Sequence, residues 1–418
     1  MAMNTNPARG MRDFLPEDKA LREYVKSTIR SVYETSGFTE IETPAVENIE
    51  NLLGSNGGEN LKLIYKILKR GEKLKLDQDN LSEQVLSDLG LRYDLTIPLC
   101  RYYAGNKAKL PTVFKAIQIG DVYRAERSQK GRYRTFVQCD VDVIGDTSVT
   151  TEIDLINTVT KALTALSLDN FVVKINDRRV LKGAISFAGF TDEEFPKVCI
   201  ILDKMDKIGE EGVKNELIKE GYNEANIEKL MGLLKEVTSD NIQALENYGV
   251  EDDAVKSLST IISAIKALSG GKYRIEFDFT LVRGMGYYTG TIFEIGMEDL
   301  GYSVAGGGRY DELIGKFIGD SVPACGFSIG FERIVDLLKE RGFKPNKRDK
   351  VALVYGDDTA IEKVMTSAEQ LRSEGSIVSI LVKAKKFGKQ LNRLVGEGYN
   401  KVAILKDGEL ELKNLDQE

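Results

Sequence analysis

The segment from 123 to 136 carries the side chains best suited to chemistry. Tyr-Arg-Ala-Glu-Arg at 123–127 and Gly-Arg-Tyr-Arg-Thr-Phe at 131–136 place several guanidinium groups, a glutamate and an aromatic ring around one predicted hairpin. Guanidinium forks suit phosphate oxygens, and an aromatic face suits a nucleobase. The segment therefore predicts a hairpin that clamps a nucleotide, with a surface ladder of ion pairs as the alternative.

The second strand of this hairpin has two chemically different faces. Successive side chains of a strand point to opposite sides. One side would carry Val137, Cys139, Val141 and Val143, and the other Arg134, Phe136, Gln138, Asp140 and Asp142. The polar side could line a shared pocket or be the outer face of a half-exposed strand.

Three glycine-rich segments follow. Gly-Gly-Gly-Arg-Tyr-Asp at 306–311 leads into a predicted helix, and its glycines would allow a close backbone approach to a ligand. Residues 281–290 combine an arginine with two tyrosines, for which core packing is the alternative. Residues 325–333 join a glycine-spaced strand to a helix with Arg333 in its first turn. A cation there opposes the helix dipole unless an anion lies nearby, which favours a phosphate partner.

Composition limits the chemistry further. The 418 residues include no histidine, which excludes histidine bases, Ser-His-Asp triads and histidine-ligated metals. The four cysteines are far apart and predict buried thiols, so no side chains are assigned to a metal. A net charge of −7, no apolar run of membrane length and no apolar signal core predict a cytoplasmic protein with no membrane contact.

The elements that must position these residues fall into separate blocks. Helical spacing predicts a helix over 17–36, and alternation predicts strands over 38–43, 114–145, 272–279 and 287–295. The stretch 170–272 is charged and helical in pattern, which indicates an insertion into a parent domain formed by 1–169 and 273–340. A polar linker, 341–350, precedes an alternating β/α series over 351–418, which predicts a small separate α/β domain.

Taken in chain order, these segments resemble the three motifs of class II aminoacyl-tRNA synthetases. Residues 9–16 and 37–44 resemble motif 1, residues 123–142 resemble motif 2 and residues 326–333 resemble motif 3. More narrowly, residues 281–288 and 307–311 resemble the two signatures of the histidyl-tRNA synthetase family. The resemblance covers nearly the whole chain, so the joint signal is stronger than any one motif.

The resemblance implies an α+β fold: an antiparallel-sheet catalytic core that forms a homodimer through motif 1, a helical insertion, and a C-terminal α/β anticodon-binding domain. It implies that the chain uses ATP with Mg2+ to activate L-histidine as histidyl-adenylate and transfers the histidine to the 3′ end of histidine tRNA. Chemistry of this kind needs no protein nucleophile, so it is compatible with a chain that has no histidine residue.

The resemblance also assigns roles to residues on the nucleotide side. Arg124 would grip the α-phosphate of ATP, Glu126 would read the adenine amino group, and Phe136 would stack on the base. Arg132 would contact ATP, and Arg333 would hold its γ-phosphate end. Arg283 would take the place that a magnesium ion often fills beside the α-phosphate, stabilising charge as the carboxylate attacks.

On the histidine side, Asp94 and Gln138 would hold the substrate amino group, while Asp142 and Tyr288 would hydrogen-bond the two imidazole nitrogens. The loop at Gln129 would meet the tRNA acceptor stem. The remaining histidine-binding positions are Thr96, Tyr287, Gly307 and Tyr310.

Two positions depart from the family pattern, and one related class is a rival. Gly286 stands where the first histidine signature usually has an aspartate, and Asp94 is one methylene shorter than the glutamate of many bacterial members. The rival is a non-catalytic paralogue, such as the histidine-sensing regulatory subunit of ATP phosphoribosyltransferase. That class typically lacks the C-terminal domain and the catalytic arginine, whereas this chain has a C-terminal α/β region and Arg283.

Overall fold

The computed structural model describes residues 3–54, 58–76, 81–127, 132–237, 241–282, 286–297, 301–345, 348–356, 358–406 and 409–415. The chain divides into two compact units, 1–341 and 342–418. In the part of the chain that the structure describes, no helix is both long enough and apolar enough to cross a membrane.

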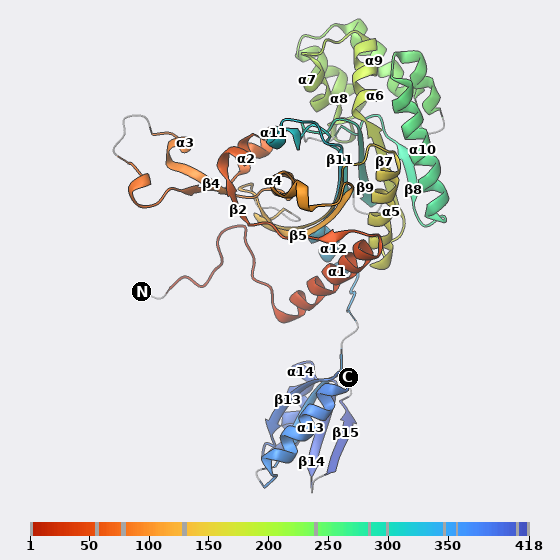
Figure 1. The fold of residues 1–418 in the computed structure, drawn as a ribbon. Coiled ribbons are helices and arrows are strands. Elements are labelled where there is room, and N and C mark those ends of the chain that lie inside the picture. Colours follow the sequence, from red (N-terminus) through yellow and green to blue (C-terminus); the bar gives the residue numbers. More distant parts are fainter. Residues whose placement is uncertain are drawn as a thin grey trace. The chain divides into compact units, whose positions relative to one another are not determined.

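The first unit is built on one large sheet (Figure 1). Its eight strands follow the order β1-β5-β6-β11-β10-β9-β7-β8. The six strands from β5 to β7 in this order are antiparallel to one another. The two edge strands run parallel to the strands they pair with, β1 to β5 and β8 to β7. The strands are β1 (Thr39–Glu40), β5 (Phe114–Tyr123), β6 (Thr135–Ile144), β7 (Phe171–Asp177), β8 (Arg274–Phe277), β9 (Thr291–Met297), β10 (Ser303–Arg309) and β11 (Ala324–Gly330).

The register of β6 explains how a polar row fits inside this sheet. Asp142 lies opposite Gly326 of β11, and Asp140 lies opposite Ser328. Because the neighbouring strand has small residues at these positions, there is room beside it for the two carboxylates. Asp140 and Asp142 are both buried, so this part of the polar side of β6 faces the interior and is not an outer face.

Three helices cover the strands near β6: α1 (Pro16–Thr35), α5 (Thr150–Ala165) and α12 (Phe331–Glu340). As expected, α1 begins with a proline and acidic residues, and it buries Leu21, Val25, Ile29 and Tyr33 at four-residue spacing. It packs on α5 and α12, and both of these contact β6. The helices thereby support β6, the second strand of the motif 2 segment.

The helical insertion begins later than the sequence pattern indicates. Residues 171–177 form β7, which pairs with β9 and β8 in the large sheet. The helices then run from α6 to α10, coloured green in Figure 1. They are α6 (Arg178–Ala188), α7 (Phe195–Leu202), α8 (Met205–Lys219), α9 (Glu224–Glu236), the 3-10 helix η4 (Ile242–Tyr248) and α10 (Asp252–Ser269).

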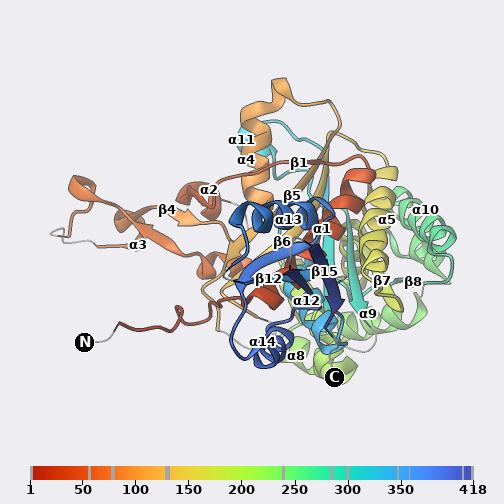
Figure 2. The same ribbon diagram turned by 90° about the horizontal axis from the view of Figure 1, so that it is seen from below.

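A second, three-stranded sheet extends away from the large one (Figure 2). Its strand order is β2-β4-β3, and the helix α4 follows β4 directly and carries the chain back to the large sheet. The elements are β2 (Val46–Asn48), α2 (Ile49–Leu53), η1 (Gly58–Leu63), β3 (Lys66–Leu68), η2 (Gly71–Lys73), α3 (Glu83–Leu86), β4 (Ser87–Leu91), α4 (Thr96–Asn106) and η3 (Lys107–Lys109).

Two predicted boundaries were wrong: a helix was expected directly after the glycine-rich run 306–311, and a strand was expected to begin at Tyr287. The glycines at 306–308 lie within β10, and the short helix α11 (Gly315–Ile318) begins several residues later. The reason is steric, since a Cβ atom on Gly307 would lie 2.0 Å from the carbonyl oxygen of Gly326 on the next strand. The predicted strand over 287–295 begins only at Thr291, so Tyr287 and Tyr288 lie on the segment before β9.

The second unit is a four-stranded sheet with order β13-β12-β14-β15, in which only β15 is antiparallel to its neighbour. One apolar core contains residues of α13 and another contains residues of α14, so the helices cover opposite faces of the sheet. The predicted β/α series is confirmed, and β15 was not predicted. The elements are β12 (Lys350–Tyr355), α13 (Ile361–Ser373), β13 (Ile377–Val382), α14 (Phe387–Gly396), β14 (Lys401–Lys406) and β15 (Glu409–Asn414).

Candidate active site

A buried carboxylate on β6 forms the floor of the candidate site. Asp142 is 3% exposed, and the hydroxyl of Tyr310 donates to its Oδ1 atom over 2.6 Å. A Cβ atom on Gly326 would lie 1.9 Å from the same oxygen, so only glycine leaves room for Asp142 on the neighbouring strand. The Asp142 side chain is therefore held in one orientation by packing and by a short hydrogen bond.

Asp94 and Gln138 each present an acceptor that has no partner among the residues that the structure describes. The backbone N–H of Ile97, in the first turn of α4, donates to Asp94 Oδ1 over 3.2 Å, and Gln138 Nε2 donates to Ser328 Oγ over 3.0 Å. Asp94 Oδ2 and Gln138 Oε1 are buried, and neither accepts a hydrogen bond from any described residue. A buried acceptor without a partner is costly, so these two atoms indicate a place for a donor from a ligand.

The carboxylates in this region favour protons. Burial raises the pKa of Asp94 to about 6, although the Ile97 hydrogen bond and the charge of Arg124 act in the opposite direction. Burial raises the pKa of Asp142 to about 7, opposed by the Tyr310 hydrogen bond and assisted by the charge of Asp94. Burial and the charge of Asp142 also place the pKa of Asp140 well above its ordinary value. A cationic ligand would compensate this excess of buried negative charge.

Because Asp142 is buried, protein stability should depend on pH in a definite direction. The pKa of an aspartate in an unfolded chain is about 3.9, and that of folded Asp142 is about 7. The folded state binds more protons between these values, so the stabilising contribution of this group is complete below the lower value and is lost as the pH rises through the upper one. Asp142→Asn lacks this titration. Relative to the wild type, the variant should gain unfolding free energy between about pH 5 and pH 7.5, as measured by urea unfolding; a constant difference would contradict this explanation.

Aromatic residues enclose the carboxylates. The ring centroid of Tyr287 lies 4.9 Å from that of Tyr288 and 6.0 Å from that of Tyr310. Burial raises the pKa of the Tyr287 hydroxyl well above its ordinary value, while the side chain of Thr96, the first residue of α4, faces Tyr287 and acts to lower that pKa. The structure thus brings together the predicted residues Asp142, Thr96, Tyr287, Tyr288 and Tyr310, while Gly307 lets β10 and β11 approach each other beneath them.

The arginine and the phenylalanine of the predicted nucleotide clamp also meet. The guanidinium carbon of Arg124 lies 5.0 Å from the Phe136 ring centroid, and Arg124 Nε donates to the carbonyl oxygen of Tyr93 over 3.0 Å. Tyr93 directly precedes Asp94, and the charge of Arg124 acts on Asp94. Arg124 therefore lies between the Phe136 ring and the segment that carries Asp94.

The other predicted nucleotide contacts make interactions of their own. Glu126 lies 3.8 Å from Arg132, and its backbone carbonyl accepts from Arg134 Nε over 3.0 Å. Arg333 occupies the first turn of α12, as predicted, and donates to the carbonyl oxygen of Ser303. Two further predicted residues, Arg283 and Gln129, lie outside the described residues.

The prediction missed three positions. Asp140 was placed on the polar face of β6 without a role, although alternation alone puts it between Gln138 and Asp142. Ser328 and Gly326 complete the pocket from β11. The spacing of small residues in Cys-Gly-Phe-Ser-Ile-Gly, 325–330, was the signal that could have identified them, because alternate positions share a face of a strand.

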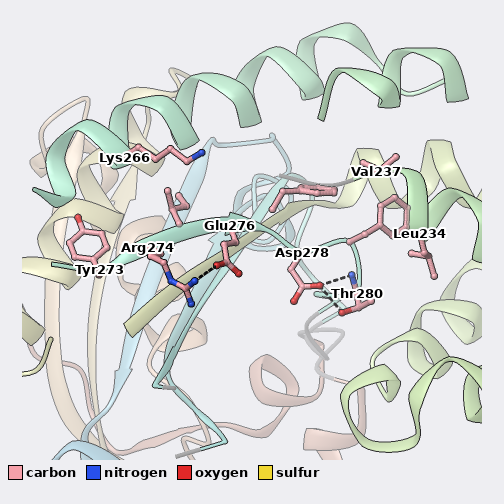
Figure 3. Close-up of a pocket in the computed structure, with 11 residues that line it drawn as sticks. Leu234, Val237, Lys266, Tyr273, Arg274, Glu276, Asp278 and Thr280 are labelled. Atoms are coloured by element: carbon pink, nitrogen blue, oxygen red, sulfur yellow. Dashed lines mark hydrogen bonds and ion pairs between the residues drawn. The ribbon is translucent and has the colours of Figure 1, made fainter. Parts of the chain in front are cut away.

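A separate groove lies at the free edge of the sheet (Figure 3). It runs beside β8, with Leu234 and Val237 on one side, and contains the pairs Arg274–Glu276 and Asp278–Thr280. The groove contains none of the predicted site residues, and β8 is separated from β6 by four strands. The groove is therefore separate from the site that the sequence predicts.

The antiparallel sheet, with a carboxylate pocket beside an arginine and a phenylalanine of one hairpin, defines the catalytic domain of a class II aminoacyl-tRNA synthetase. The chain belongs to the histidyl-tRNA synthetase family, whose model matches residues 10–334. It is 43% identical to a histidine–tRNA ligase of Leifsonia xyli, over 97% of this chain and 96% of the relative.

Two solved structures are similar to the whole chain. Histidyl-tRNA synthetase from a Nostoc species has 30% identity and a TM-score of 0.83, covering 99% of this chain and 95% of that one. A Bacillus halodurans protein described as an ATP phosphoribosyltransferase regulatory subunit/histidyl-tRNA synthetase has 22% identity and a TM-score of 0.79, covering 97% of this chain and 99% of that one. The second likeness concerns the fold alone.

Proposed function

We propose that this protein activates L-histidine with ATP to form histidyl-adenylate and then transfers the histidine to the 3′ end of histidine tRNA. The observation that carries the proposal is the pair of buried acceptors, Asp94 Oδ2 and Gln138 Oε1, which have no hydrogen-bond partner among the described residues, together with the Asp142–Tyr310 hydrogen bond. An α-ammonium group supplies donors for the first pair. An imidazole supplies a ring nitrogen for Asp142.

In the first step, a histidine carboxylate oxygen attacks the α-phosphorus of ATP, and pyrophosphate leaves. Arg124 would neutralise the charge that develops on the α-phosphate, while Phe136 stacks on adenine and Glu126 accepts from its amino group. Arg132 and Arg333 would bind the outer phosphates, and Arg283 would act beside Arg124. In the second step, a hydroxyl of the terminal ribose attacks the carbonyl carbon, and AMP leaves.

Recognition of the side chain rests on Asp142 and Tyr288, which would pair with the two imidazole nitrogens. Tyr310 donates to Asp142 and so leaves the other carboxylate oxygen for the ring. Tyr287 and Thr96 would form part of the wall of this histidine site. A site that hydrogen-bonds both nitrogens would discriminate against apolar side chains, because its buried polar groups would then have no partners.

Further partners follow from this reaction. We propose that Mg2+ enters bound to the ATP phosphates, that two copies of the chain form a homodimer through the motif 1 segment, and that the enzyme works in the cytoplasm, where charged tRNA is used. Gln129 would meet the acceptor stem. On the C-terminal unit, the exposed cations Lys383, Lys385, Lys386 and Lys389 would contact the tRNA backbone near the anticodon.

The test is histidine-dependent ATP–pyrophosphate exchange, followed by charging of histidine tRNA. We expect exchange with histidine and not with other amino acids, and a loss of about 100-fold or more in Arg283→Ala. The exposed ion pair Lys182–Asp192 in the insertion offers a control variant, Lys182→Ala, which should retain exchange. Histidine binding without exchange would instead favour a regulatory role of the kind borne by the phosphoribosyltransferase subunit.

A further inference from the structure

One buried carboxylate, Glu332, ties the N-terminal segment to both sides of the proposed ATP site. Glu332 is 4% exposed and is the residue before Arg333 in the first turn of α12. Its two oxygens accept from both terminal nitrogens of Arg22, over 2.6 Å and 2.8 Å. Arg12, from the segment before α1, donates to the same carboxylate over 2.5 Å.

The same carboxylate reaches the strand that carries the adenine platform. The backbone N–H of Val137 donates to Glu332 Oε1 over 3.3 Å. Val137 lies between Phe136, the proposed adenine platform, and Gln138, a proposed histidine contact. Glu332 therefore contacts the backbone of motif 2 directly, while its own backbone leads into the proposed γ-phosphate contact, Arg333.

The N-terminal segment closes over this cluster from the outside. The guanidinium carbon of Arg12 lies 3.2 Å from the Tyr133 ring centroid, and that of Arg22 lies 3.9 Å from the Phe14 ring centroid. The Arg134 backbone N–H donates to the carbonyl oxygen of Gly10 over 2.9 Å. The segment is thus bound to the base of the motif 2 hairpin at several points.

We propose that Glu332 is a positioning residue for ATP, and that residues 9–14, held on it by Arg12, set the spacing between Phe136 and Arg333. The inference rests on the proposed function, because it uses the ATP contacts assigned there. A bidentate Arg–carboxylate pair has a defined geometry. It can therefore fix the position of one chain segment relative to another as well as hold the two segments together. The proposal concerns binding of the nucleotide and not of histidine.

The decisive variant is Arg12→Ala, because the Arg12 side chain is 28% exposed and its loss leaves the buried Arg22–Glu332 pair intact. Loss of one charge-assisted contact should weaken ATP binding about five- to tenfold, with histidine affinity changed less than about twofold. Arg12→Lys should recover part of the loss, since it restores the charge without the planar fork. The Kd of ATP and that of histidine are measured separately by equilibrium dialysis.

Asp18→Asn is the matched control. It breaks an exposed ion pair with Lys339 that also joins α1 to α12, so a general loosening of these helices would appear in it as well. Equal weakening of ATP binding in Arg12→Ala and Asp18→Asn, or unchanged ATP binding in Arg12→Ala, would overturn the proposal. Because dialysis does not depend on turnover, a wild type that binds ATP without exchange would contradict the proposed function while the comparison of variants still decides this inference.

Discussion

Replacing Arg124 by alanine should lower the rate of histidine-dependent pyrophosphate exchange by about 10²- to 10³-fold. Arg124 lies over the Phe136 ring and donates to the backbone of Tyr93, the residue before Asp94, which is the position that the proposed reaction gives to the α-phosphate contact. A preorganised cation at this point stabilises charge that develops as the carboxylate attacks. Water could replace it only by reorienting during the reaction, which costs free energy. The effect should therefore appear mainly in kcat.

Arg124→Lys separates charge from geometry. Lysine keeps the positive charge but cannot make a forked contact with two phosphate oxygens, so its activity should fall between those of the wild type and the alanine variant. Lys182→Ala, at an exposed position in the insertion, controls for effects of mutagenesis and purification and should retain full exchange. If Arg124→Ala lost less than about tenfold in kcat, the α-phosphate would have to be assigned to another cation.

The second large effect is expected at Asp142, in the proposed histidine site. Asp142→Asn has nearly the same shape, so it should fit opposite Gly326, but it replaces one carboxylate oxygen with a donor. The amide cannot attract a protonated ring nitrogen as the carboxylate does. We expect kcat/KM for histidine to fall by about 10²- to 10³-fold, with the KM of ATP nearly unchanged.

Tyr310→Phe is the graded partner of this variant. It removes only the hydroxyl that donates to Asp142 over 2.6 Å, leaving the ring in the core. Since the carboxylate keeps its charge and loses only part of its orientation, the loss should be about tenfold. Exchange assays at several histidine concentrations measure both variants. An Asp142→Asn enzyme with a normal KM for histidine would show that the imidazole lies elsewhere.

The stability effect at Asp142 has the opposite sign from the activity effect. The wild type keeps a buried carboxylate that favours a proton, and its neighbours Asp94 and Asp140 also have raised pKa values. The asparagine variant should therefore be more stable than the wild type above about pH 7, where the full difference has developed, while it loses function. Such an exchange of stability for function is expected where a site must remain polar before its ligand arrives.

Local patterns were enough to predict several elements and the composition of the site. The alternation of β6, the helical spacing of α1 and the β/α series of the C-terminal unit appear where they were expected, because each depends on neighbours within one segment. The resemblance to known motifs then supplied roles for Arg124, Phe136 and Arg333. Those assignments needed only the order and identity of residues along the chain.

Other features depended on segments far apart in the sequence. Nothing local to residues 306–308 distinguishes a strand from a turn before a helix, and β7 begins a stretch that otherwise has a helical pattern. Pairing decides both, since β10 must approach β11 at Gly307, and β7 must fill the position between β9 and β8. A β-ladder draws its stability from cross-strand neighbours, which a local pattern does not contain.

The sequence by itself thus determined which chemical groups the site contains: carboxylates, guanidinium groups and aromatic rings, with no histidine. Only the tertiary structure decided which of their atoms are already paired. It directs Tyr310 to Asp142 and four N–H donors from three residues to Glu332, while Asp94 Oδ2 and Gln138 Oε1 stay without partners among the described residues. The physical reason is that burial and hydrogen bonding depend on contacts across more than a hundred residues of chain, whereas residue type and spacing are local.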